Sequence, residues 1–144
     1  MTPQQKILVQ QSFALVAPIA ETAATLFYAR LFELDPSLRR MFSGDMAEQG
    51  RKLMQMLTVA VRGLDDLEAL VPAVRALGLR HARYGVQPGH YETVAIALLW
   101  TLERGLGDAF TPAVRAAWAT VYWLLADTMQ AGALDVMLPV ARTA

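Results

Sequence analysis

The chemistry open to this chain depends first on its two histidines, His81 and His90. His81 lies four residues after Leu77 and seven after Val74, so a helix places its imidazole on an apolar face. A histidine on such a face is either a core residue that hydrogen-bonds a backbone carbonyl or a metal ligand. His90 follows Pro88 closely, at a helix start, where we expect it to act as a cap or to face solvent.

Two polar side chains interrupt apolar helical stripes elsewhere in the chain. Tyr28 directly follows Phe27, and Gln49 comes four residues before Leu53 and eight before Leu57. Each has an ordinary interpretation: Tyr28 as a core residue with its hydroxyl at the edge, and Gln49 as a first-turn residue that faces water. Neither residue assigns a site by itself.

Several other chemistries lack their residues. The chain has no cysteine, which excludes disulfides, thiolate metal sites, thiol catalysis and thioether attachment of a cofactor. The acidic residues around Asp65 and Asp66 fall in a predicted loop, where solvated charges are ordinary, so we do not interpret them as a catalytic pair. The Gly105–Asp108 segment lacks the glycine spacing of a nucleotide-binding loop and follows no strand.

Length and charge bound the remaining classes. The chain has 144 residues, of which 55% are hydrophobic and 18% charged, and this composition predicts one compact domain over residues 1–144. Thirteen basic residues balance thirteen acidic ones. We therefore expect neither nucleic acid nor an anionic membrane surface as a partner.

The N-terminus and the longest apolar stretches indicate a cytoplasmic protein. The first six residues lack the basic start and apolar block of a secretory signal. The apolar stretches 94–100 and 121–126 are far shorter than the roughly 20 residues that cross a bilayer. The absence of cysteine is compatible with a reducing compartment.

Periodicity predicts an all-α fold of seven to eight helices. Apolar residues recur at helical spacing along the chain, and no alternating run is typical of a strand. The expected helix starts combine capping residues and first-turn prolines, at Thr2-Pro3, Asp35-Pro36, Asp45, Pro72, Pro88 and Thr111-Pro112. A second helix is expected from Ile19 to about Phe32. Gly132 is expected to end regular structure, which leaves 131–144 as an irregular tail.

The segment around His81 resembles a known family. Residues 77–86, LGLRHARYGV, followed by Pro88-Gly89-His90-Tyr91, are similar to the proximal histidine, the following corner and the next helix of the globins. Residues 35–42 match the segment that carries the family's haem-packing phenylalanine, and residues 117–122 match its last helix. Across nearly the whole chain, the likeness is to bacterial single-domain globins and to the haem domain of flavohaemoglobins.

This resemblance implies a haem site with His81 as the iron ligand. Without cysteine the haem would be held non-covalently, as haem b. Val74 and Leu77 would face the porphyrin, with Arg51, Lys52 or Arg80 on its propionates. The implied cofactor-binding residues are Phe42, Lys52, Leu53, Leu57, Leu77, Arg80, Val86, Tyr91, Val94 and Leu98.

The resemblance also implies a polar distal side. Tyr28 matches the distal tyrosine of this subfamily, Gln49 its distal polar residue, and Leu53 the aliphatic residue above the iron. A phenol and an amide aimed at bound dioxygen would favour it over carbon monoxide, because ferrous iron shifts negative charge onto dioxygen. At roughly 1.4 kcal/mol each, either donor would change the affinity about tenfold.

The chain departs from the flavohaemoglobin pattern in two respects. It ends at Ala144 without flavin and nicotinamide domains, so we expect that it cannot reduce its own iron. The glutamate that supports the proximal histidine in those proteins falls near Ala131–Ala133, where no carboxylate stands. Asp135 can substitute only if the last helix extends that far. The missing carboxylate favours reversible binding over turnover.

The predicted function is therefore reversible dioxygen binding, for storage, delivery or scavenging, with dioxygen and other diatomic gases as partners. The enzymatic alternative is a nitric oxide dioxygenase that uses an external reductase. A non-haem interaction domain would keep the fold without the cofactor, and a gas sensor would need an output domain from a partner.

Overall fold

The computed structural model describes residues 1–137, and this part of the chain is built from helices alone. It has six α-helices and three 3-10 helices, where the sequence predicted seven to eight helices in all. The all-α prediction is confirmed. The elements are α1 (Pro3–Val16), η1 (Ala17–Ile19), α2 (Ala20–Leu34), η2 (Pro36–Met41), α3 (Met46–Gly63), α4 (Leu67–Arg83), α5 (Pro88–Leu106), η3 (Gly107–Ala109) and α6 (Pro112–Met137).

Most helices begin where the capping residues predict. Thr2 and Gln5 form a reciprocal capping box at the start of α1. Asp45 accepts a hydrogen bond from the Ala47 amide at the start of α3, and the Thr111 hydroxyl accepts one from Val114 at the start of α6. His90 caps α5, because its Nδ1 accepts the backbone N–H of Gln87.

The predicted start of α4 at Pro72 is wrong. The helix begins at Leu67, because the Asp66 side chain accepts the Ala69 amide and caps the helix one turn earlier. Pro72 therefore lies inside α4, where its ring costs one backbone hydrogen bond near the helix start. The acidic residues assigned to a loop include this cap.

The predicted end of the last helix is also wrong. α6 continues through Gly132 to Met137, so Asp135 lies on the helix. The rest of the expected tail, residues 138–144, lies outside the described residues. The reason for a glycine inside α6 is its packing against α4, described below.

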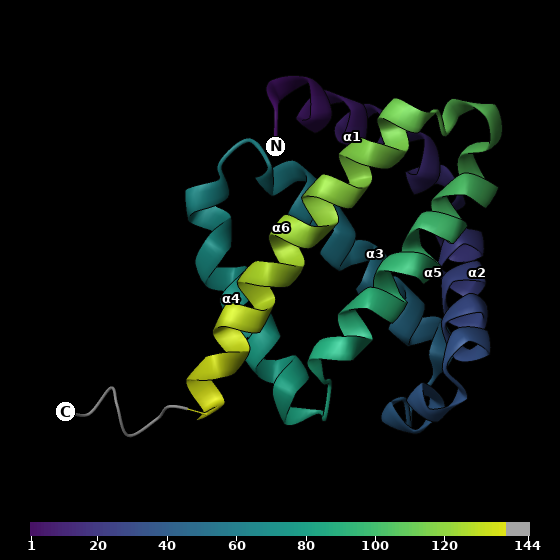
Figure 1. The fold of residues 1–144 in the computed structure, drawn as a ribbon. Helices are drawn as coiled ribbons and strands as arrows, with labels where there is room; N and C mark the ends of the chain where they lie inside the picture. Colours follow the sequence, from purple (N-terminus) through teal and green to yellow (C-terminus); the bar gives the residue numbers. More distant parts are fainter. Residues whose placement is uncertain (138–144) are drawn as a thin grey trace.

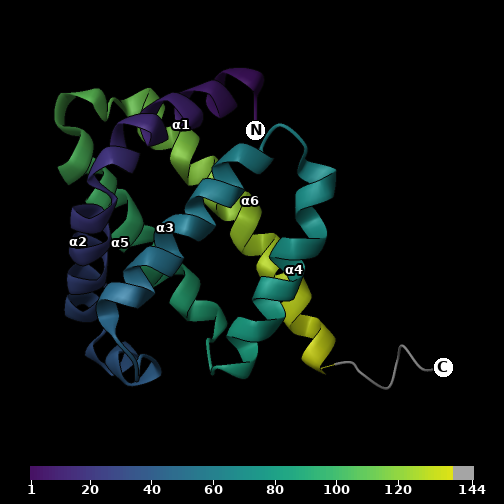
Figure 2. The same cartoon turned by 180° about the vertical axis from the view of Figure 1, so that it is seen from behind.

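Two helix pairs define the arrangement in Figures 1 and 2. α2 and α5 run side by side, and α4 crosses the C-terminal half of α6. α3 lies behind α6 in Figure 1 and in front of it in Figure 2. One core cluster joins buried side chains from α1, α2, α3, α5 and α6, including Phe13, Phe27, Met54, Leu98 and Trp118.

The stretch Pro3–Leu34 has the length and mean hydropathy of a membrane span. Sequence inspection alone did not identify this stretch. In the fold it is divided by η1, and Val9, Phe13, Phe27 and Leu31 from it are buried in the protein core. A core helix pair meets the same criteria, so the stretch is weak evidence for a membrane.

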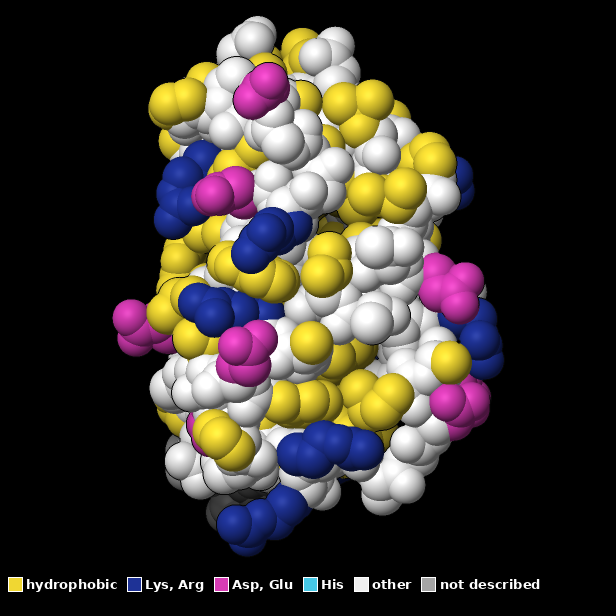
Figure 3. Space-filling view, turned by 90° about the vertical axis from the view of Figure 1, so that its right-hand side faces the viewer, with side chains coloured by type: hydrophobic (Ala, Val, Ile, Leu, Met, Phe, Trp, Pro, Cys, Tyr) yellow, Lys and Arg dark blue, Asp and Glu magenta, His cyan; other side chains and the backbone are white. Residues whose placement is uncertain are grey.

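Charged and apolar side chains are interspersed on the right-hand face of the molecule. Figure 3 shows basic and acidic groups alternating there with apolar ones, without a broad basic patch on that face. This distribution agrees with the equal numbers of basic and acidic residues in the chain.

Candidate functional site

His81 lies near the end of α4, with one ring nitrogen committed to its own helix. Its Nδ1 is 2.8 Å from the carbonyl oxygen of Leu77. A carbonyl only accepts, so Nδ1 carries the proton and the lone pair of Nε2 is available to a metal. Burial lowers the pKa of His81, which keeps the imidazole neutral. The two interpretations of His81 are thus compatible, since the hydrogen bond of a core histidine also orients a ligand.

The turn after α4 holds His81 from its other side. The amide of Val86 donates to the His81 carbonyl at 3.0 Å. Gly85 has a φ of 96°, a left-handed conformation that glycine adopts without strain. The chain can therefore leave the helix two residues after Arg83 and return Val86 beside the end of α4.

Tyr28 of α2 and Gln49 of α3 meet in the fold. The Gln49 amide Nε2 donates to the Tyr28 hydroxyl oxygen at 3.3 Å. Burial raises the pKa of Tyr28, so its hydroxyl stays protonated. Because Gln49 donates to the oxygen, the Tyr28 proton remains available to another acceptor. The pair can donate a hydrogen bond to a ligand.

An aromatic cluster fixes the orientation of the Tyr28 ring. Phe42, just after η2, packs edge to face on Tyr28 with ring centroids 5.3 Å apart, and on Phe32 at 5.5 Å. The Arg39 guanidinium donates to the Phe42 carbonyl at 2.8 Å. Phe32 was not among the predicted site residues, although its position one turn after Tyr28 was a usable signal.

The predicted apolar site residues are incompletely covered by protein. Leu53 and Leu57 of α3, Leu77 of α4, Val86 and Val94 are all half-buried, while Leu98 is buried. Leu53, Leu57 and Leu98 also line a small apolar cavity of about 10 Å³ with Phe27 and Phe13, among others. Half-buried aliphatic side chains on both α3 and α4 fit a flat apolar ligand.

Two predicted cations are not brought to the site by any contact. Lys52 and Arg80 are exposed, and Lys52 lies 3.9 Å from Glu48 of its own helix.

Tyr91, another predicted site residue, is buried at the start of α5, where burial raises the pKa of its hydroxyl. Its backbone carbonyl accepts a hydrogen bond from the Tyr122 hydroxyl at 2.5 Å. This bond ties α5 to α6.

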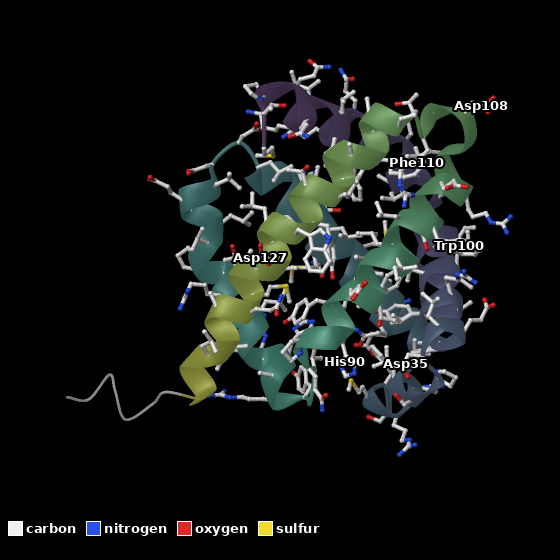
Figure 4. All side chains as sticks on the ribbon, in the orientation of Figure 1. Asp35, His90, Trp100, Asp108, Phe110 and Asp127 are labelled. Carbon is white, nitrogen blue, oxygen red and sulfur yellow. The ribbon has the colours of Figure 1, made fainter. Side chains whose placement is uncertain are left out.

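A groove between α5 and α6 is a separate feature. Its volume is about 390 Å³, and its walls include Trp100, Trp123, Glu103 and Arg115 but none of the predicted site residues. In Figure 4, Trp100 projects from α5 on the side away from α4. The guanidiniums of Arg30 and Arg104 lie 5.3 and 4.9 Å from the Trp100 ring.

The donor set fits an iron porphyrin better than a bare metal ion. Among the side chains that the structure describes, no group of three or more histidine, aspartate or glutamate residues could hold an ion. Porphyrin iron needs only one protein ligand, and a neutral imidazole is the usual one in globins. His81 and the half-buried aliphatic residues meet that requirement.

Comparison with known proteins gives the family. The globin family model matches residues 25–129. A neuroglobin from Tetraodon nigroviridis is 30% identical over 92% of both chains. Flavohemoproteins from Vibrio cholerae and Xylella fastidiosa are 30% and 29% identical over 88% and 90% of this chain, which spans only 33% of each of them.

A solved structure supports the same assignment. It is an engineered carbene transferase, built on a protein of Rhodothermus marinus that is assigned as a nitric oxide dioxygenase. It superimposes with a TM-score of 0.86 at 30% identity, over 98% of this chain and 99% of the other. The chain therefore belongs to the globin family, and haem is its cofactor.

Proposed function

We propose that this globin binds dioxygen reversibly, with His81 as the iron ligand of a non-covalent haem b and with Tyr28 and Gln49 as hydrogen-bond donors to the bound gas. The hydrogen bond between Tyr28 and Gln49 carries this proposal. Two residues from different helices meet as a polar pair beside the aromatic ring of Phe42. A pocket that served only to exclude water would not need this pair of hydrogen-bonding side chains.

Each protein group has a definite task in this proposal. Haem supplies, when bound, a ferrous iron that takes up diatomic gases. The Leu77 carbonyl fixes the His81 tautomer and so leaves the lone pair of Nε2 for the iron. Tyr28 keeps its proton and offers it as a donor, while Gln49 orients the phenol and adds an amide N–H. Leu53 and Leu57 exclude water beside this pair.

The remaining predicted residues complete the pocket. Leu77 and Val74 would cover the proximal face, with Val86, Val94 and Leu98 closing it and Phe42 stacking at the edge. Lys52 and Arg80 are exposed enough to turn toward the propionates. We further propose that the whole chain acts as a single haem domain in the cytoplasm, where gas delivery, storage or scavenging would take place.

The second candidate is nitric oxide dioxygenation with an external reductase. It is favoured by the likeness to the flavohemoproteins and to the Rhodothermus marinus protein. Two bound gases would react in the same pocket, and re-reduction of ferric iron would decide whether the reaction repeats. α6 carries no carboxylate from Ala131 to Ala133, which favours reversible binding, whereas Asp135, which lies on α6, meets the condition for a substitute carboxylate and favours turnover.

The first experiment is the visible spectrum of the purified protein with dithionite and then air, beside His81→Ala. We expect a Soret band and reversible oxy bands in the wild type, both lost in the variant. Stoichiometric haem that persists unchanged in His81→Ala would refute the ligand assignment. The dioxygenase function would instead be supported if the protein formed nitrate from nitric oxide continuously with a flavin reductase and did not do so without the reductase.

A further inference from the structure

The crossing of α4 and α6 brings two helix backbones into direct contact at two glycines. A Cβ built on Gly78 would lie well within 3.0 Å of the carbonyl of Met129, and one built on Gly132 equally close to the carbonyl of Arg75. Real Cβ atoms essentially never approach other atoms so closely. Because backbone blocks both positions, no side-chain rotation could make room for a methyl group.

This crossing lies next to the predicted iron ligand. Gly78 comes three residues before His81 and directly after Leu77, whose carbonyl holds the His81 ring. A rigid helix transmits a displacement at Gly78 to His81 with little loss, since three residues make less than one turn. The position of α4 against α6 therefore sets the position of the imidazole.

Further bonds keep α6 in place at this crossing. The Arg75 guanidinium donates to the Ala131 carbonyl of α6 at 3.4 Å. The Tyr122 hydroxyl donates to the Tyr91 carbonyl at the start of α5. α6 is thus bonded to both helices that flank the turn after His81, and buried Trp118 anchors its first half by donating to the Ser12 hydroxyl at 2.8 Å.

We infer that α6 is a rigid brace for the proximal side, and that Gly78 and Gly132 are positioning residues that set the distance and tilt of His81 relative to the haem iron. The inference rests on the proposed role of His81. Alanine at either glycine must push α4 and α6 apart, because an ordinary contact of 3.4 Å or more replaces the overlap.

The test is the iron–histidine stretching band of the ferrous, haem-loaded protein, measured by resonance Raman spectroscopy. We expect the band to shift in Gly78→Ala and Gly132→Ala. Gly105→Ala is the matched control, because a Cβ there meets only the Ile19 side chain at 3.4 Å within a helix. A role in stability alone would lower the urea midpoint of the glycine variants without moving the band.

The outcomes separate this inference from the proposed function. The wild type should show an iron–histidine band that is absent in His81→Ala. If it does not, the ligand assignment fails and the inference fails with it. If that band is present but unchanged in both folded glycine variants, only the inference is overturned. Should the glycine variants not fold, Arg75→Met removes the guanidinium that bonds α4 to α6 while both glycines stay in place. A broader band in Arg75→Met would then support the brace, and an unchanged one would refute it.

Discussion

The two sides of the candidate haem site are built in different ways. On the proximal side, His81 is held by backbone groups: the Leu77 carbonyl, the Val86 amide and, through α4, the glycine crossing with α6. On the distal side, the contacts that orient Tyr28 and Gln49 are made between side chains, through one hydrogen bond and an aromatic cluster.

This difference implies different responses to substitution. Backbone contacts in packed helices are close to all-or-none, because a helix yields as a rigid body. Side-chain donors can be removed one at a time without moving the backbone, so their effects are graded. We therefore expect proximal changes to decide whether the site exists and distal changes to tune how tightly it holds a gas.

The largest effect is expected from removing the imidazole. His81→Gly should lose stoichiometric haem, because no other described histidine lies on the site. Added imidazole should restore the Soret band by taking the vacated position. Haem content and the visible spectrum measure this. If haem is instead lost in His90→Gly and the Soret band returns there with imidazole, His90 is the iron ligand.

The glycine crossing should give the next largest effect, now on stability. Gly78→Ala should lower the free energy of unfolding by about 1–3 kcal/mol, as overpacking does in a filled interior. Gly105→Ala should leave it unchanged or raise it by up to about 1 kcal/mol, because alanine is the better helix former. Urea unfolding compares the two. Equal stabilities would mean that the α4–α6 contact gives way easily.

Distal substitutions should change the dioxygen off-rate about tenfold each, or roughly 1.4 kcal/mol. Tyr28→Phe and Gln49→Leu each remove one donor. Since Gln49 also orients Tyr28, the double variant should fall short of the product of the two. Stopped-flow release measures the rates.

Exposed counterparts serve as controls for the distal pair. Tyr84→Phe removes a phenol that is 69% exposed, and Gln55→Leu removes an exposed amide of α3. Both should leave the off-rate unchanged. An off-rate that responds equally to Tyr84→Phe and Tyr28→Phe would refute the distal assignment.

Acidification should weaken the proximal side of the haem-free protein. Burial holds the pKa of His81 below its usual 6.5, so the unfolded chain binds the proton more tightly than the folded one. The stability that neutral His81 contributes is full above that usual value and is lost as the pH falls through the lowered pKa. Urea midpoints from about pH 7.5 to pH 5 should therefore fall further for the wild type than for His81→Gln, which does not titrate. A midpoint that falls as far in His81→Gln as in the wild type would contradict this cause.

The smallest effects are expected from the exposed cations. Lys52→Ala or Arg80→Ala should speed haem loss by less than about fivefold, because exposed ion pairs contribute little. Arg62→Ala, at the far end of α3, should not change it. Haem transfer to an excess of acceptor apoprotein measures the rates. No response in Lys52→Ala and Arg80→Ala would remove these residues from the propionate site.

Local sequence signals predicted much of the fold. Thr2, Asp45 and Thr111 cap helices as expected, and His90 caps α5, because capping depends on residues within one turn of each other. The predicted start of α4 at Pro72 was wrong, because proline suits the first turn of a helix and no local signal favours the Asp66 cap over it.

The sequence by itself determined the helical periodicity, the all-α class and the types of residue at the candidate site, since these depend on near neighbours and on chemistry. Only the tertiary structure decided that Gln49 meets Tyr28 and that Gly132 lies inside a helix against α4. Glycine ends a helix or permits a close crossing with equal ease, and the choice depends on a partner more than fifty residues away. Contacts between distant segments follow from how whole helices pack, which no local pattern encodes.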